Sequence, residues 1–180
     1  AKTARDCVNA IHEFVNNMTE PEPDVSIYSY QLGALAICQL PGAAEEALQI
    51  LQNLQRENPT LLISKEASPL YSTVLLAFAN SVEQPDGPAI LEKAEQWWEY
   101  LGEEYEMTND TIAYASWMKM RSSLGQAAET EQVLDYMMSR NIQPSVIHYN
   151  IALNAWANAA ASDPNLQTQN KAEALLHKMT

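Results

Sequence analysis

Apolar residues recur along this chain in stripes with helical spacing, and four of the stripes open on a tyrosine. Tyr28 is followed by Leu32 and Leu35, and Tyr71, Tyr114 and Tyr149 open similar stripes. Offsets of three, four and seven residues place such side chains on one face of a helix. The pattern therefore predicts four helices, called the first helices below, over residues 26–38, 69–81, 111–122 and 146–158.

A second apolar stripe follows each first helix. It lies in four related segments: EALQILQNL (46–54), KAEQWWEYL (93–101), ETEQVLDYM (129–137) and KAEALLHKM (171–179). Pro, Gly, Asp and Asn between the stripes indicate turns. We therefore predict four second helices, over 44–57, 88–102, 126–139 and from 168 onward.

The helix-turn-helix unit repeats, because its tyrosines are 43, 43 and 35 residues apart. Periods in this range are typical of helical-repeat arrays, whose units bury their apolar faces by stacking. We expect an all-α protein, a right-handed α-solenoid of antiparallel helix-turn-helix repeats. Residues 1–180 would form a single array, in which 1–24 end a preceding repeat, 25–67, 68–110 and 111–145 are repeats, and 146–180 are an incomplete repeat.

The alignment of the units also predicts the core. The side chains expected to be buried between helices are Tyr28, Leu51, Leu75, Trp98, Trp117, Leu134, Leu153 and Leu176. Trp98 aligns with the core leucines, so its neighbour Trp97 is expected to pack on the next repeat. The side chains expected to be exposed are Glu99, Glu103, Glu104 and Glu106.

Charge restricts the partners of this chain. The net charge is −13, from 23 acidic residues against 10 Lys and Arg. This opposes an electrostatic grip on nucleic acid, and DNA is not expected as a partner. Nine acidic residues and one lysine lie between Glu83 and Asp110, either as a solvated outer face or as an acidic surface that docks on a protein complex. No apolar run approaches the roughly 18 residues of a membrane helix, so membrane insertion is not expected.

Residues with catalytic or metal-binding chemistry are scattered. Cys7 and Cys38 have no metal-ligand spacing, lie on helical apolar stripes and are expected to be core thiols in a reducing compartment. The three histidines lie in different units, as surface or interface residues: His12, His148 and His177. There is no Gly-rich phosphate loop, no Cys/His nucleophile arrangement and no pair of catalytic acids. We predict no enzyme activity, no cofactor and no metal.

The compact unit TIAYASWMKMRSSLGQAAETEQVLDYMMSRNIQPS (111–145) resembles a pentatricopeptide repeat, whose pattern runs from V-x-Y-N to K-P-D. VIHYNIALNAWA (146–157) matches the start of that pattern, and EPEPDVSIYSY (20–30) carries its P-D and V-x-I-Y. The Trp and Leu-Gly that tetratricopeptide repeats place ahead of a Tyr are missing from all four units. The resemblance covers essentially the whole chain.

The resemblance implies binding of single-stranded RNA, one base per repeat, read by two side chains. It also implies a mitochondrial or plastid protein that acts in transcript processing, stability or translation. The implied base readers are Ser29 with Ala67, Ser72 with Asp110, Ala115 with Ser145, and Asn150 alone. The implied positions that sandwich bases are Ser26, Pro69, Ile112 and Ile147.

Several residues depart from that pattern. Ser72 with Asp110 resembles a guanine-reading pair and Asn150 a pyrimidine reader, but Ala115 offers no hydrogen bond to a base. The positions where the family often has a lysine near phosphates hold Ile37, Asn80, Ser123 and Asn158. The only Lys or Arg residues on any first helix are Lys119 and Arg121, both expected on the inner face, whereas an RNA groove combines backbone charges with stacking surfaces. Two functions stay open: an organellar RNA-binding module, or an acidic α-solenoid scaffold or structural subunit that docks on an organellar protein complex without RNA contact.

Overall fold

The described part of the chain consists of helices joined by turns. The computed structural model describes residues 3–19, 23–62, 67–104, 110–162 and 168–178, and these ranges contain helices and turns but no strand. The all-α prediction is confirmed. The helices are α1 (Ala4–Asn16), α2 (Val25–Cys38), α3 (Ala43–Glu57), α4 (Pro59–Leu62), α5 (Ser68–Ser81), α6 (Gly87–Glu104), α7 (Thr111–Ser123), α8 (Ala127–Ser139), α9 (Val146–Ser162) and α10 (Thr168–Lys178).

Eight of these helices lie where the periodicity predicts them, within a few residues. Two differences have local causes. Helix α9, which is one of the four first helices, continues to Ser162 instead of ending near 158, because the added residues include three alanines, the best helix formers. The short helix α4 was not predicted, since its first residue is Pro59 and proline in a helix interior breaks the helix. Proline is well tolerated at the first position of a helix, where its missing N–H costs nothing.

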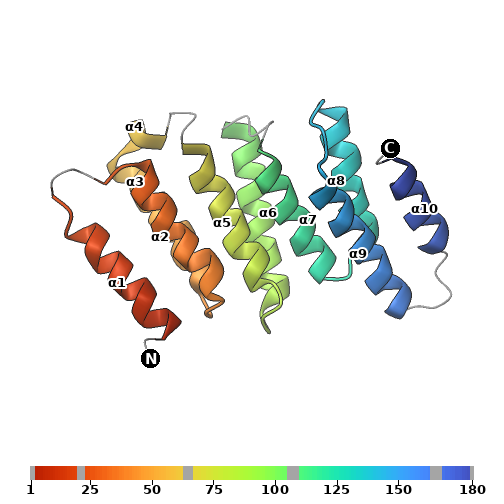
Figure 1. Cartoon of the computed structure of the whole chain (residues 1–180). Coiled ribbons are helices and arrows are strands. Elements are labelled where there is room, and N and C mark those ends of the chain that lie inside the picture. The colour runs from red at the N-terminus through yellow and green to blue at the C-terminus, as the bar shows by residue number, and fades with distance from the viewer. Residues whose placement is uncertain (1–2, 20–22, 63–66, 105–109, 163–167, 179–180) are drawn as a thin grey trace.

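The first helices α2, α5, α7 and α9 form a row in which each packs against the next. The second helices α3, α6, α8 and α10 each pack on the first helix of their own unit, and α1 packs on α2. Figure 1 shows this order from one end of the molecule to the other, with the two termini at opposite ends. Every central unit therefore has a neighbour on both sides.

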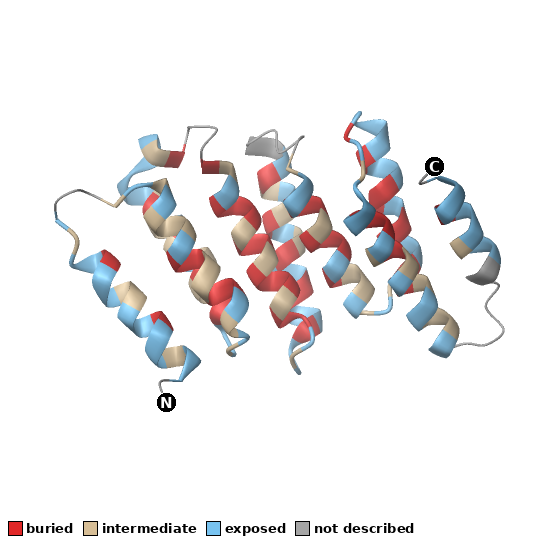
Figure 2. Cartoon of the chain, in the orientation of Figure 1, coloured by how far each residue is buried: buried red, intermediate tan, exposed pale blue. Residues whose placement is uncertain are grey.

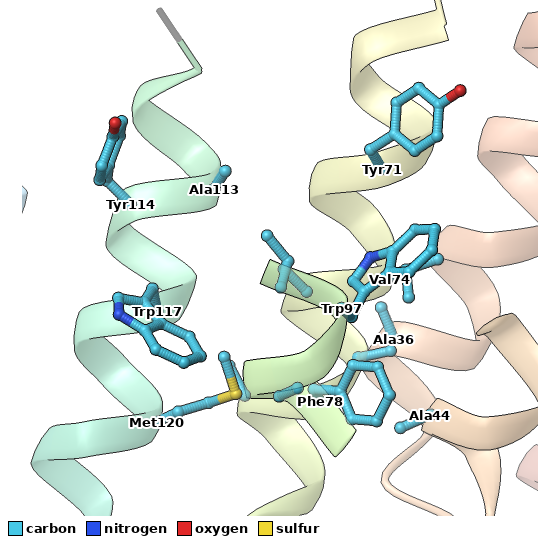
Figure 3. Packing of buried hydrophobic residues seen from close by; sticks show 14 of the residues in the cluster. Ala36, Ala44, Tyr71, Val74, Phe78, Trp97, Ala113, Tyr114, Trp117 and Met120 are labelled. Atoms are coloured by element: carbon cyan, nitrogen blue, oxygen red, sulfur yellow. The ribbon is translucent and has the colours of Figure 1, made fainter. Parts of the chain in front are cut away.

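One apolar core runs through the row. Phe78 of α5 is fully buried and points toward Ala36 and Ala44, which come from α2 and α3 (Figure 3). These small side chains leave room for the phenyl ring between the helices. Buried residues are concentrated in the central helices, whereas α1 and α10 are largely exposed (Figure 2). The core thus weakens toward both ends of the described chain.

The burial predictions are confirmed at four positions, Leu51, Leu75, Trp117 and Leu134. Tyr28, Trp98 and Leu153 are only half-buried, although they pack against the core. The prediction is wrong for Leu176, which is 53% exposed, while the preceding Leu175 is fully buried. Glu99 is exposed as predicted; the side chains of Glu103, Glu104 and Glu106 lie outside the described residues.

The tryptophan pair of α6 is arranged in the reverse of the predicted way. Trp97 is buried and stacks on Tyr100 of its own helix, with its ring centroid 6.2 Å from that of Tyr71. Trp98 is the residue that reaches the next unit, stacking on Trp117 at 5.2 Å with an interplanar angle of 8°. The column of Trp98, Leu134 and Leu176 therefore faces away from its own unit. Leu176 is exposed because no described helix packs on that side of α10.

Candidate binding surface

The first helices share a surface that we call the first-helix face. It consists of the residues two positions before and one, five and nine positions after each tyrosine, which lie within an arc of about 80° at 3.6 residues per turn, away from the core stripe. Its sixteen residues are Ser26, Ser29, Gly33, Ile37, Pro69, Ser72, Leu76, Asn80, Ile112, Ala115, Lys119, Ser123, Ile147, Asn150, Asn154 and Asn158. Lys119 is the one charged residue of the sixteen, so none of the acidic residues lies on this face.

Part of the first-helix face is apolar and open to solvent. The exposed fraction is 73% for Ile37, 59% for Ile112 and 63% for Ile147. Tyr30, beside the face on α2, is 74% exposed. Large exposed apolar side chains that recur on one surface are typical of interaction sites. This face therefore has the exposed apolar residues of a binding surface. It lacks the several Lys and Arg residues of a surface that binds phosphates.

Two of the three serine candidates for base reading, Ser72 and Ser29, use their hydroxyl groups within their own helices. The Ser72 hydroxyl lies 3.3 Å from the carbonyl oxygen of Ser68 and 3.2 Å from that of Pro69, and the residue is 2% exposed. The Ser29 hydroxyl donates to the carbonyl of Val25 at 2.8 Å. Such bonds to a preceding turn are common for serine inside helices. To donate to a base, either hydroxyl would first have to leave these carbonyls.

Asp110, the predicted partner of Ser72, holds the start of α7. Its Oδ1 accepts hydrogen bonds from the backbone N–H groups of Ile112 and Ala113, at 3.0 and 3.1 Å. Its Oδ2 accepts from the hydroxyl of Ser68 at 3.0 Å, which joins α5 to α7. Both carboxylate oxygens are therefore hydrogen-bonded within the protein and stabilise its fold. Ala67, the predicted partner of Ser29, is completely buried.

In the third predicted pair, Ala115 is half-buried and Ser145 is exposed. The backbone N–H and the hydroxyl group of Ser145 both contact the ring of a histidine. The N–H of Ser145 donates to Nδ1 of His148 at 3.0 Å, and its hydroxyl lies 2.8 Å from the same atom. Nδ1 is thus an acceptor, so the ring proton sits on Nε2 and donates to the carbonyl of Thr111 at 2.9 Å. His148 is 2% exposed and connects α9 to α7. The fourth reader, Asn150, is exposed, and no described hydrogen bond involves its side chain.

The two cations expected on the first-helix face have different places. The Lys119 ammonium donates to Oδ1 of Asn80 at 2.6 Å, and Nδ2 of Asn80 donates to the carbonyl of Ala36 at 2.7 Å. Arg121 is not on this face: it pairs with Glu95 of α6 at 3.0 Å and lies over the ring of Trp117. The placement was wrong because Arg121 follows Tyr114 by seven residues, which is the core-facing offset. One cation, already hydrogen-bonded, remains on the face.

A cavity of about 700 Å³ opens beside this face between α2, α4 and α5. Its lining includes Ser26, Ser29 and Pro69, so one predicted reader and two predicted sandwich positions meet there. Tyr30 adds an aromatic wall. Asp24, whose Oδ1 caps α2 through the N–H of Ile27 at 3.0 Å, is the single charged residue among the described residues of the lining. Its described lining can hold a flat or apolar group and includes no cation that would attract an anion.

The acidic region 83–110 is partly used by the fold. Glu83 accepts from the hydroxyl of Ser123 at 3.1 Å, and Glu95 and Asp110 have the partners given above. The remaining acidic side chains that the structure describes there take part in none of its recorded hydrogen bonds or ion pairs and are exposed: Asp86, Glu92 and Glu99. Residues 105–109 lie outside the described residues. The described acidic surface is therefore smaller than the sequence predicts.

Other chemistry is sparse in the described ranges. No group of three or more His, Cys, Asp or Glu side chains there has an arrangement that holds a metal ion. Cys7 is exposed, so the expectation of a core thiol was wrong for it, and the half-buried Cys38 donates to the carbonyl of Leu35 at 3.2 Å. No helix in those ranges combines the length and apolar character needed to cross a membrane.

Comparison with known proteins finds no match to this chain among protein-family models or among curated proteins. The resemblance to pentatricopeptide repeats therefore stays a prediction that rests on the quoted residues. The geometry of the first-helix face is the observation from which function has to be argued.

Proposed function

We propose that this chain is a right-handed α-solenoid scaffold whose first-helix face binds an extended segment of a partner protein. The observation that carries this proposal is the charge and exposure of that face. It bears one cation and no acidic residue, while Ile37, Ile112 and Ile147 are each more than half exposed. A polypeptide segment with apolar side chains can bury these isoleucines without having to neutralise any charge.

RNA is the weaker candidate because of its phosphates. Affinity for a nucleic acid strand comes largely from Lys and Arg that neutralise phosphates and release counterions. Lys119 is the single Lys or Arg on the first-helix face, and Asn80 already holds it. The Ser72 hydroxyl and both oxygens of Asp110 are hydrogen-bonded within the fold.

One observation nevertheless favours RNA as a second candidate function. The cavity between α2 and α5 brings Ser26, Ser29 and Pro69 together, where the resemblance to pentatricopeptide repeats implies a base. Asn150, the implied pyrimidine reader, is exposed. Under either function, the mitochondrial or plastid location rests on the same resemblance.

A titration of the whole chain with short single-stranded RNAs separates the two functions. It is run at about 50 and about 200 mM salt, where each phosphate contact on a single strand contributes a slope of roughly 0.7 in log affinity against log salt. For the scaffold we expect a dissociation constant on the order of 10⁻⁴ M or weaker and a slope near that of one contact. Submicromolar, steeply salt-dependent binding would establish the RNA function instead.

Photocrosslinking tests the protein-binding function directly. A photoreactive residue replaces Ile112 on the first-helix face in one variant and Gln132, exposed on α8, in the control variant. In extract from the source cells we expect adducts from position 112, removed by protease and resistant to ribonuclease, and none from position 132. Adducts that ribonuclease removes would contradict the proposal.

A further inference from the structure

The helix α9 carries three asparagines at intervals of one helical turn, which we call the amide row: Asn150, Asn154 and Asn158. All three are exposed, and no described hydrogen bond involves their side-chain amides. Asn80, which occupies on α5 the place of Asn158, is different: its NH₂ donates to Ala36 and its carbonyl accepts from Lys119. The amides of the row are thus free to bind something outside the chain.

The spacing of the amide row matches an extended polypeptide. Residues four apart in a helix are separated by about 6 Å along its axis. Alternate residues of an extended strand are separated by about 6.7 Å. Over the two intervals of the row the mismatch is about 1.5 Å, which the rotatable side chains can absorb. A strand that follows this row crosses the axis of α9 at roughly 26°, the inclination of such rows.

The chemistry of the row also matches a polypeptide backbone. Each asparagine amide offers both an acceptor oxygen and a donor NH₂. Each residue of an extended strand likewise has one N–H and one C=O. An RNA backbone has one donor per nucleotide, the ribose 2′-hydroxyl, but its phosphates would find no Lys or Arg on α9. Ile147, 63% exposed and one turn before the row, can cover an apolar side chain of the bound strand.

We propose that Asn150, Asn154 and Asn158 bind the backbone of an extended peptide strand from a partner protein, with an apolar side chain of that strand on Ile147. This inference rests on the proposed protein-binding function and places its recognition site on α9. Backbone hydrogen bonds supply the affinity in this mode, and the side-chain contact at Ile147 supplies the selectivity.

The test uses a displayed library of random short peptides, selected on the immobilised whole chain and then measured as synthetic peptides by fluorescence anisotropy. The variant Asn150→Ala/Asn154→Ala/Asn158→Ala removes the amide row. The control Gln52→Ala/Gln96→Ala/Gln132→Ala removes three exposed amides from the second helices. We expect binding to weaken at least tenfold in the first variant, about 1.4 kcal/mol, and to stay unchanged in the control. Peptides N-methylated at alternate backbone positions should lose binding to the same degree.

Circular dichroism of both variants has to show unchanged helix content. Peptides that bind the asparagine variant as tightly as the natural chain would overturn the assignment to α9. If Ile112→Asp abolished their binding in that case, the first-helix face would still be the protein-binding surface, and only the further inference would fail. If the library yielded no binder and single-stranded RNA bound the same face, both proposals would fall.

Discussion

The second unit (α5 and α6) and the last unit (α9 and α10) carry equivalent apolar residues with different burial. Leu75 of α5 is fully buried, whereas Leu153, at the same distance after its tyrosine, is half-buried. The helix α5 packs against both α2 and α7, while α9 has a first helix on one side, α7. The same apolar spacing therefore gives fully buried side chains in the middle of the row and partly exposed ones in the last unit.

The two regions are also held by different interactions. In the middle, Trp98 stacks on Trp117 across the boundary between units. At the end, the largely buried carboxylate of Glu131 accepts from the indole N–H of Trp156 and pairs with Lys171, both at 3.1 Å. Aromatic stacking thus joins the central units beside polar links such as Asp110 to Ser68, whereas in the last unit a polar cluster ties α8, α9 and α10 together.

The largest expected effect comes from a pair of equivalent leucines. Leu134→Ala removes a fully buried side chain, and we expect the free energy of unfolding to fall by about 2–5 kcal/mol. Leu176→Ala, at the aligned position of α10, is expected to cost less than about 0.5 kcal/mol, since the side chain is already exposed. Urea unfolding followed by circular dichroism measures both. Equal losses would mean that Leu176 is covered in solution.

The polar cluster of the last unit gives the next effect. Glu131→Ala leaves the Trp156 indole N–H without a partner inside the protein, and we expect a loss of about 1–3 kcal/mol. The loss should be local, so hydrogen exchange should rise most in α10. The control Asp135→Ala removes a 56% exposed partner of Lys178 and is expected to cost about 0–1 kcal/mol. Protection in α10 that survives Glu131→Ala would show that apolar contact alone holds this helix.

A smaller effect tests the junction between α5 and α7. Asp110→Ala removes the N-cap of α7 and the link to Ser68, for an expected loss of about 0.5–2 kcal/mol. Ser72→Ala should cost less, because it removes only bonds within its own helix. Thermal unfolding of the two variants measures the difference. If Asp110→Ala left stability unchanged and altered binding of an RNA probe, the carboxylate would be a base reader as the resemblance implies.

The smallest effect concerns pH at the last unit. The hydrogen bond from Lys178 to Asp135 raises the pKa of this lysine above its ordinary value of 10.5. A raised pKa stabilises the fold at pH values below 10.5, and this contribution is lost as the pH rises through the higher folded value. The difference in melting temperature between the natural chain and Lys178→Met should therefore shrink between neutral and strongly alkaline pH. A difference that does not change with pH would contradict the ion pair.

The helices and their order could be predicted from sequence because they depend on local information. Apolar residues at helical spacing mark the faces, and proline, glycine and polar turn residues mark the ends. The same reasoning places the first-helix face and shows that it lacks acidic residues. The core-facing position of Arg121 was also encoded in its offset from Tyr114 and was overlooked.

The tertiary structure decided which apolar residues are buried and what the polar residues do. Spacing alone does not tell that Trp98 meets the next unit while Trp97 stays in its own, because this depends on how neighbouring helices cross. Asp110 reaches Ser68, and His148 reaches the carbonyl of Thr111, across distances of about 40 residues in sequence that only helix packing closes. A helical pattern shows which face a residue is on; only the neighbouring helices determine whether that face meets protein or solvent.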